Sequence, residues 1–280
     1  EQLEALHKGH DSARAMLRLV VAMTGAGDEK RAFEAAERAL VLAPSSEEIL
    51  RVHARLALDI GTAHRAARSV EALARMRPDV AEYQVFLGET WSLRQKMGDA
   101  SEAYLRALAL DPDLVVARKP LGLALNHESR FAEGREHLER FLAEHPEDLD
   151  ALAGLAEAEE RLGEPEAAAA RARKVLDVEP THARANLVLG MVRSGRGEFE
   201  QARRILEQAV EVDPWLAKAH YQLSFACARV GDRDCARRHL QLYERALEGP
   251  ESTFVQLEAA SPEAASPAAE TMMMRGEGDS

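Results

Sequence analysis

The sequence predicts an all-α protein, and more narrowly an α-solenoid of helix–turn–helix repeats. Three observations lead to this prediction. Aromatic residues make up only 5% of the 280 residues, while Ala, Leu, Glu and Arg dominate, and unbranched side chains lose little rotamer freedom in a helix. Several columns of small residues, Leu and Gly keep one common period. Prolines recur with that same period, every 34 residues, at Pro44, Pro78, Pro112, Pro146, Pro180 and Pro214.

The period divides most of the chain into seven repeats. Each proline is placed at position 32 of a 34-residue repeat, and Pro250 comes two residues after the next expected position. Length alone suggests about two ordinary domains, but stacked repeats can form one continuous body of this size. The predicted repeats are 13–46, 47–80, 81–114, 115–148, 149–182, 183–216 and 217–250.

Four columns of the repeat each have a physical reason. Position 15 is Gly in five repeats, which lets the chain reverse after a first helix, since Gly adopts positive φ without penalty. Positions 8 and 20 are small in six and seven repeats, which allows two antiparallel helices to approach closely. Position 7 is Leu in six repeats, with His53 as the exception, and fills the seam between them. Proline at position 32 ends the second helix.

Two repeats depart from the pattern. In repeat 3, Gln95 stands at position 15 and a glycine follows only at Gly98, so we expect a longer first helix and a late second one. In repeat 4, Ser129 stands at position 15 and Pro120 falls inside the expected first helix. We therefore expect this helix to begin near Pro120, with an irregularity or hinge at residues 115–121.

The two ends are expected to differ from the repeats. Residues 1–12 are predicted to be the end of a preceding helix or an N-terminal cap. Residues 251–260 place Phe254 and Leu257 in repeat register and are predicted to be a capping helix over the last repeat. Residues 261–280 are rich in Ala, Ser, Pro and Glu and are predicted to be a disordered acidic tail.

Repeat 6 carries a recognisable signature: Leu189, Gly190, Gly197, Ala202, Ala209 and Pro214. With this pattern, the chain resembles the tetratricopeptide repeat (TPR) family from residue 13 to residue 250. The resemblance implies a right-handed superhelix whose concave groove is lined by the first helix of each repeat, mainly through positions 2, 5, 9 and 12. It specifies the fold and leaves the partner open.

Composition and motifs argue against several functions. The net charge of −12 disfavours binding to nucleic acid, and the sequence shows no continuous basic stripe. No apolar run approaches the ~20 residues that span a bilayer. Metalloprotease, nucleophile-elbow, phosphate-loop and paired-cysteine motifs are all absent. We therefore expect no enzyme activity, no cofactor and no metal site.

Two cysteines, Cys227 and Cys235, lie eight residues apart across the turn at Gly231. They could meet on facing helices and form a disulfide, or they could be two small buried apolar side chains. The sequence does not decide between these alternatives.

The resemblance maps a candidate partner-binding groove onto the last two repeats. Aromatic and aliphatic side chains flanked by cations are typical of binding hot spots, and a peptide with an acidic group and an apolar side chain would suit them. Alternatively, the helix around Phe254 covers this surface as an internal cap. The groove residues predicted in this way are Arg184, Leu187, Met191, Lys218, Tyr221 and Phe225.

A secondary zone in the first two repeats comprises Arg14, Arg51 and Arg55. It could bind an acidic segment, although a solvated charged face is the simpler interpretation. Some family members hold a C-terminal carboxylate with paired Lys and Asn. Repeat 1 has Leu17 and Val21 at two of the groove positions, and no Asn matches in repeats 1–3, so this binding mode is disfavoured.

The functional prediction is a non-catalytic scaffold that binds a partner peptide or helix in the groove. Alternatively, the chain is the repeat region of a larger polypeptide, such as an enzyme or an envelope assembly factor, whose activity lies elsewhere. Residues 1–8 fit the repeat register and favour this second possibility, while the acidic tail suggests a natural C-terminus. The Ala- and Arg-rich composition hints at a bacterial origin. The partner, the oligomeric state and the compartment, cytoplasmic or periplasmic, stay open.

Overall fold

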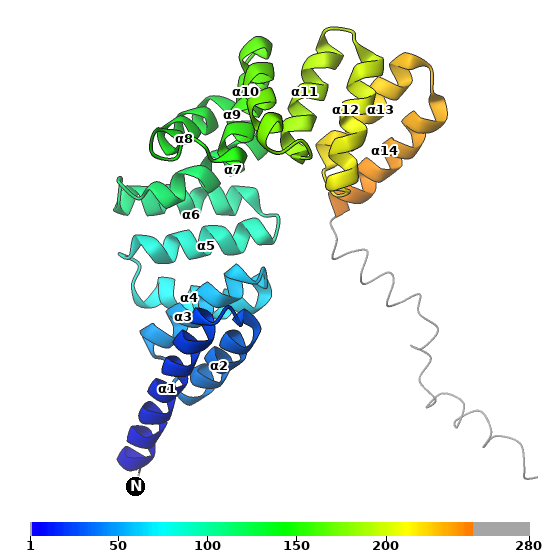
Figure 1. Cartoon of the computed structure of the whole chain (residues 1–280). Helices are drawn as coiled ribbons and strands as arrows, with labels where there is room; N and C mark the ends of the chain where they lie inside the picture. Colours follow the sequence, from blue (N-terminus) through cyan, green and yellow to red (C-terminus); the bar gives the residue numbers. More distant parts are fainter. Residues whose placement is uncertain (1, 249–280) are drawn as a thin grey trace, which may run out of the picture. The chain divides into compact units, whose positions relative to one another are not determined.

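The computed structural model describes the backbone of residues 2–248 and the side chains of residues 12–247 (Figure 1). This part of the chain holds fourteen α-helices, one short 3-10 helix and no strand. The helices pack in succession as an all-α solenoid of helix pairs, which confirms the predicted fold class. The capping helix expected at 251–260 and the tail expected at 261–280 lie outside the described residues. Within them, none of the helices has the length and apolar character needed to cross a bilayer.

The chain divides into two compact units, residues 1–168 and residues from 169 onward, and each is described by itself. The helices of the first compact unit are α1 (Gln2–Gly25), α2 (Glu29–Leu42), α3 (Glu47–Asp59), α4 (Ala63–Met76), α5 (Ala81–Leu93), α6 (Met97–Leu110), η1 (Val115–Ala117), α7 (Arg118–His127), α8 (Phe131–Glu144) and α9 (Leu149–Arg161).

The division falls inside α10 (Pro165–Val178). The second compact unit continues with α11 (Ala183–Gly195), α12 (Phe199–Val212), α13 (Ala217–Val230) and α14 (Arg233–Glu248). Odd-numbered helices from α3 onward begin at residue 47, 81, 149, 183 or 217, with a 3-10 turn at 115. These are the residues at which the predicted repeats begin, because the proline period marks the helix boundaries.

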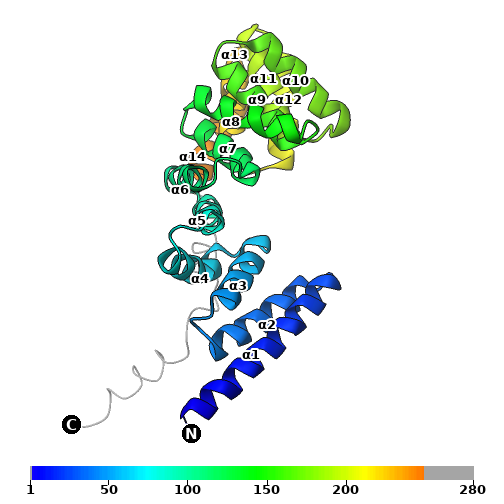
Figure 2. The same ribbon diagram turned by 90° about the vertical axis from the view of Figure 1, so that its left-hand side faces the viewer.

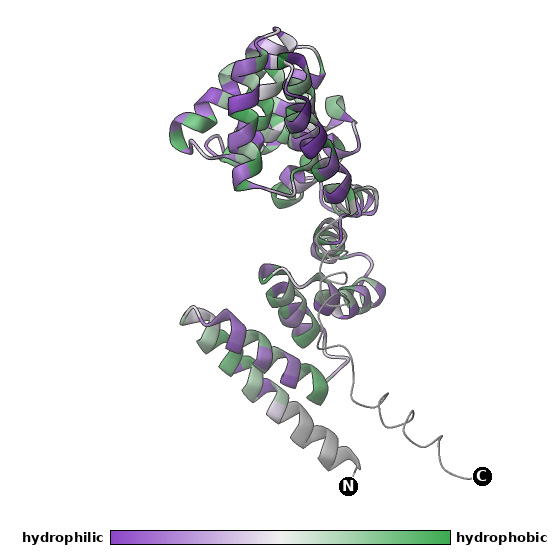
Figure 3. Cartoon of the chain, turned by 90° about the vertical axis from the view of Figure 1, so that its right-hand side faces the viewer, coloured by the Kyte–Doolittle hydropathy of each residue, from purple (hydrophilic) through white to green (hydrophobic). Residues whose placement is uncertain are grey.

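Contacts link helices that are neighbours in sequence from α1 to α9 and from α11 to α14. The first and second helix of a pair contact most extensively, as in α1 with α2 and α5 with α6, and α2, α4, α6, α8 and α12 each contact the first helix that follows. Figure 2 shows α1 and α2 running side by side. Most helices are green on one side and purple on the other in Figure 3, as expected for helices that bury one stripe of side chains.

The small residue at position 8 makes room for the side chain at position 24. A Cβ added at Gly88 would lie 2.4 Å from the Tyr104 ring, and one added at Gly190 would lie 2.5 Å from Leu206 Cγ. Both distances are shorter than a carbon–carbon contact allows. Close approach of the paired helices therefore depends on these glycines, as the sequence predicted.

The tight turns use the left-handed backbone conformation, also where the sequence lacks glycine. Gly61, Gly163 and Gly231 have φ values of 72°, 86° and 88°, and Gln95 and Ser129 adopt the same conformation at 59° and 65°. The expectation of a longer first helix in repeat 3 is therefore wrong: α5 has 13 residues, like α3, and α6 begins at Met97. The packing of both helices fixes the turn, and Gln95 accepts a conformation that L-residues rarely adopt.

Repeat 4 is irregular at the predicted place. Residues 115–117 form the 3-10 helix η1, and α7 begins at Arg118, two residues before Pro120. The first N–H groups of an α-helix have no partner within the helix, so a proline in the first turn removes no hydrogen bond. As a result, α7 has only ten residues. Whether this irregularity acts as a hinge stays a prediction.

The N-terminal region differs from its predicted boundary. Residues 2–12 are helical, but they continue without interruption into the first predicted repeat, so that α1 spans Gln2–Gly25. The sequence Gln2–Gly25 contains no proline, and Gly9 alone is not sufficient to break the helix there.

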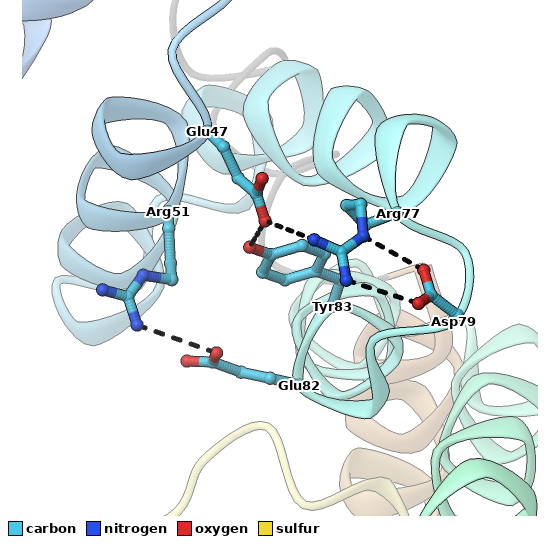
Figure 4. A network of polar contacts seen from close by, with 6 residues as sticks. All are labelled: Glu47, Arg51, Arg77, Asp79, Glu82 and Tyr83. Atoms are coloured by element: carbon cyan, nitrogen blue, oxygen red, sulfur yellow. Dashed lines mark hydrogen bonds and ion pairs between the residues drawn. The ribbon is translucent and has the colours of Figure 1, made fainter.

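A polar network joins three helices of the first compact unit (Figure 4). The Tyr83 hydroxyl on α5 donates to Glu47 Oε1 on α3 at 2.6 Å. Arg77, just after α4, lies 3.8 Å from Glu47 and donates to both oxygens of Asp79. Tyr83 is only 3% exposed, and burial together with Glu47 raises its pKa to about 12. The hydroxyl therefore stays a hydrogen-bond donor at neutral pH.

In the second compact unit, Cys227 on α13 and Cys235 on α14 form a disulfide, with Cα atoms 5.8 Å apart. This resolves the alternative that the sequence left open, although both side chains are also buried, at 0% and 5% exposure. The bond links two helices that already pack against each other across the turn at Gly231.

Candidate partner-binding surface

The first helix of each pair buries the same positions from α3 to α13. Positions 3 and 10 are at most 6% exposed in repeats 2 to 7, although position 3 of repeat 4 lies in η1. In the second compact unit, this buried side of α13 comprises Ala219, Leu223 and Ala226. These residues form one cluster with Leu187, Met191 and Leu206 of the preceding pair. A first helix therefore covers the pair before it.

Two of the predicted groove residues are covered in this way. Leu187 and Met191, at positions 5 and 9 of α11, are only 1% and 8% exposed. This corrects the expectation that they line an open groove. Their aliphatic side chains extend the core toward α13, because α11 and α13 contact each other directly. Sequence position in the repeat did not reveal that contact.

The equivalent residues of α13 are exposed instead. Tyr221 and Phe225 occupy positions 5 and 9 and are 51% and 43% exposed. The Phe225 ring meets Phe199, at the start of α12, edge to face at 5.9 Å. The Arg229 guanidinium lies 4.5 Å from the Phe199 ring centroid and 5.9 Å from that of Phe225. An exposed cation is thus held over two aromatic faces.

The exposed apolar surface continues onto α14. The Tyr221 and Tyr243 rings lie 5.5 Å apart, and Leu240 is 44% exposed. Leu240 is the counterpart of Leu206 in the preceding pair, which is fully buried. We call Tyr221, Phe225, Leu240 and Tyr243 the α13–α14 surface. Lys218 is exposed one turn before Tyr221, whereas Arg184 is half-buried on α11, and both interact with other groups of the chain.

Two buried histidines, His220 on α13 and His239 on α14, link the two helices that carry this surface. His220 Nδ1 and His239 Nδ1 are 3.0 Å apart, and His220 Nε2 lies 3.0 Å from the Pro214 carbonyl oxygen. A carbonyl only accepts, so His220 donates from Nε2, while its Nδ1 shares one hydrogen bond with His239 Nδ1. Burial, followed by the neighbouring His220 and Arg238, lowers the pKa of His239 to about 4. His239 is therefore neutral at pH 7 while its hydrogen bond to His220 links α14 to α13.

The secondary zone in the first compact unit is largely paired. Arg55 contacts Glu89 at 2.8 Å and Asp59 at 3.0 Å, and Arg51 lies 4.0 Å from Glu82 (Figure 4). Burial raises the pKa of Glu89, while Arg55 opposes this shift. Arg14 is exposed on α1. Because carboxylates compensate Arg51 and Arg55, this zone offers little net positive charge to an acidic segment.

Four residues at or beside the α13–α14 surface were not predicted from the sequence. One is Leu240, at position 24, and the other three lie at further positions. Phe199, Arg229 and Tyr243 lie at positions 17, 13 and 27, outside the positions that the family resemblance marks as groove-lining. Arg229 follows Phe225 by one helical turn, and that spacing was the available signal. Phe199 and Tyr243 come from other helices, so only the fold brings them to α13.

Comparison with known families agrees with this architecture. Two family models, both described as tetratricopeptide repeat, match the chain at residues 51–115 and at residues 125–192 and 161–214. Together these matches cover more than half of the chain. The chain belongs to the tetratricopeptide repeat family. TPR proteins bind protein or peptide partners, and the fold is typically a non-enzymatic interaction scaffold.

Solved structures resemble this TPR chain in fold. A chain of the APC/C hetero-tetramer Cut9–Hcn1 matches with a TM-score of 0.62 and 16% identity, over 81% of this chain and 46% of that one. PilW, a widely conserved type IV pilus biogenesis factor, matches with a TM-score of 0.57 and 21% identity, over 74% of this chain and 96% of that one. At these identities the similarity concerns the fold alone. No curated protein matches the sequence significantly.

Proposed function

We propose that this TPR chain is a non-catalytic interaction scaffold that binds a partner peptide or helix on the α13–α14 surface. The observation that carries the proposal is the exposure of Tyr221 and Phe225, at 51% and 43%, at positions where the preceding pair buries its side chains. Large aromatic side chains exposed one helical turn apart are typical anchors of protein interfaces.

The charges around the surface favour one kind of partner. The helix α13 carries Lys218 and Arg229 and no acidic residue, in a chain with a net charge of −12. Arg229 lies directly over the Phe199 and Phe225 rings. A partner with an apolar side chain next to a carboxylate could pack the side chain on the aromatic rings and place the carboxylate near Arg229. The proposed ligand is therefore an acidic peptide or an amphipathic helix with an acidic flank.

Peptide selection tests this proposal without knowledge of the natural partner. A displayed peptide library is selected against the full chain, and the affinity of enriched peptides is measured by fluorescence anisotropy. We expect sequences that combine acidic with Leu, Phe or Met residues. The double substitution Tyr221→Ala/Phe225→Ala should weaken binding at least about tenfold, since two interface anchors are lost.

The control variant is Val21→Ala/Val41→Ala, which shortens two residues of the first compact unit that are 71% and 82% exposed. It should change the affinity less than about twofold, because both residues are remote in sequence from α13 and solvated. Equal binding of the selected peptides to the Tyr221→Ala/Phe225→Ala variant and to the wild type would contradict the proposed site.

A further inference from the structure

The residues of the α13–α14 surface are exposed or half-buried, whereas a following helix buries the equivalent residues of the α11–α12 pair. In the α11–α12 pair, Leu187, Met191, Leu206 and Ala209 are at most 8% exposed, and they form one cluster with the buried side of α13. Their counterparts 34 residues later are the exposed or half-buried residues of the α13–α14 surface. A helix in the position that α13 occupies on the α11–α12 pair would cover them.

The chain itself contains a segment with the matching side chains. The buried side of α13 is Ala219, Leu223 and Ala226, and 34 residues later the sequence has Thr253, Leu257 and Ala260. In a helix, the spacing of four and then three residues would place all three on one face. Phe254 and Val255 add apolar surface beside that face. The segment begins directly after α14, which ends at Glu248.

Charge and tethering favour this segment over a free ligand of similar composition. Residues 251–260 include Glu251 and Glu258 and no basic residue, whereas α13 carries Lys218 and Arg229 and no acid. A helix of ten residues is only marginally stable in water by itself. A tether of a few residues gives the segment an effective concentration on the order of millimolar, so that even weak docking is populated.

We propose that residues 251–260 dock on the α13–α14 surface as a built-in ligand, which a partner has to displace. The docking follows from the structure and the sequence alone, whereas the competition with a partner rests on the proposed function. If the segment binds with an intrinsic dissociation constant about tenfold below its effective concentration, it lowers the apparent affinity for a partner about tenfold.

Hydrogen exchange of the full chain tests the docking directly. In the wild type, we expect the amides of residues 252–260 to exchange at least about tenfold more slowly than those of an unstructured peptide. The variant Phe254→Asp/Leu257→Asp should lose this protection, because two charges would be buried against Tyr221 and Phe225. The control Met272→Asp/Met273→Asp adds the same charge beyond the segment and should keep it.

The same variants separate this inference from the proposed function. Exchange of residues 252–260 at the unstructured rate in the wild type would overturn the docking, even if selected peptides bind. Protection without any peptide binding would support the docking and contradict the proposed function. If both hold, Phe254→Asp/Leu257→Asp should bind the selected peptides about tenfold more tightly than the wild type. An unchanged affinity would overturn the competition.

Discussion

In the second compact unit, the α11–α12 and α13–α14 pairs have equivalent positions with opposite exposure. Leu187 and Leu206 are at most 1% exposed, whereas Tyr221 and Leu240 are 51% and 44% exposed. The next helix in the chain makes the difference, because α13 covers the first pair and no described helix covers the second. Accessibility in such an array therefore depends on the neighbouring helix more than on the repeat position.

The α13–α14 pair also has links of its own. The disulfide between Cys227 and Cys235 and the hydrogen bond between His220 and His239 both connect α13 to α14. The equivalent positions of the preceding pair hold no cysteine and no histidine. A pair that lacks a described neighbour on one side is thus joined internally by a covalent bond and a buried polar contact.

Substitution of the leucine at position 24 by alanine should give the largest difference in unfolding free energy between the two pairs. We expect Leu206→Ala to lower the free energy of unfolding by about 3–4 kcal/mol, because Leu206 is fully buried against Gly190 and the α13 cluster. Leu240→Ala should cost about 1 kcal/mol, since nearly half of this side chain is exposed. Urea unfolding followed by circular dichroism measures both, and equal costs would invalidate the comparison.

Reduction of the disulfide should remove the covalent link of the α13–α14 pair. The bond closes a loop with a sequence separation of eight residues, which corresponds to about 2.5 kcal/mol of chain entropy. We expect urea unfolding with a phosphine reductant to show a loss of roughly this size. The variant Cys227→Ala/Cys235→Ala should be insensitive to the reductant. If the wild type is equally insensitive, the bond does not stabilise the pair.

Acidification should weaken the histidine link. The pKa of His239 is lowered to about 4, so the unfolded chain binds a proton near its ordinary pKa of about 6.5, where the folded chain does not. Stability from this group is complete above about pH 6.5 and is lost as the pH falls toward about 4, by about 3 kcal/mol. Comparison of urea unfolding at pH 7 and pH 4.5 for the wild type and His239→Gln isolates this contribution. A parallel pH dependence in both proteins would contradict it.

From α3 onward, the sequence was sufficient for most helix boundaries and for the close approach of paired helices, because proline and the position-8 residues act locally. Each constrains its own backbone or the helix directly opposite, and the 34-residue period repeats that constraint. The turn at Gln95 was not predictable in this way. There the packing of α5 on α6 imposes a left-handed backbone conformation on Gln95, which an L-residue with a side chain disfavours.

The candidate site was only partly predictable, for a different reason. The family register marks Tyr221 and Phe225 as groove-lining residues, and both are exposed. It marks Leu187 and Met191 equally, although α13 buries them. Contacts between helices of successive pairs depend on side-chain size and on the next helix in the array, and a register derived from single repeats contains neither.

The network around Tyr83 has a consequence for which helix pairs stack on each other. Buried positions that are small and aliphatic in most repeats would allow a helix pair to stack on the wrong partner. Among the seven repeats, tyrosine occurs at position 3 only in α5, where its hydroxyl meets Glu47 of α3. Placed beside another pair, Tyr83 would lack this acceptor and would leave a buried hydroxyl unpaired. This hydrogen bond thus favours the packing of α5 on α3 over packing on another pair.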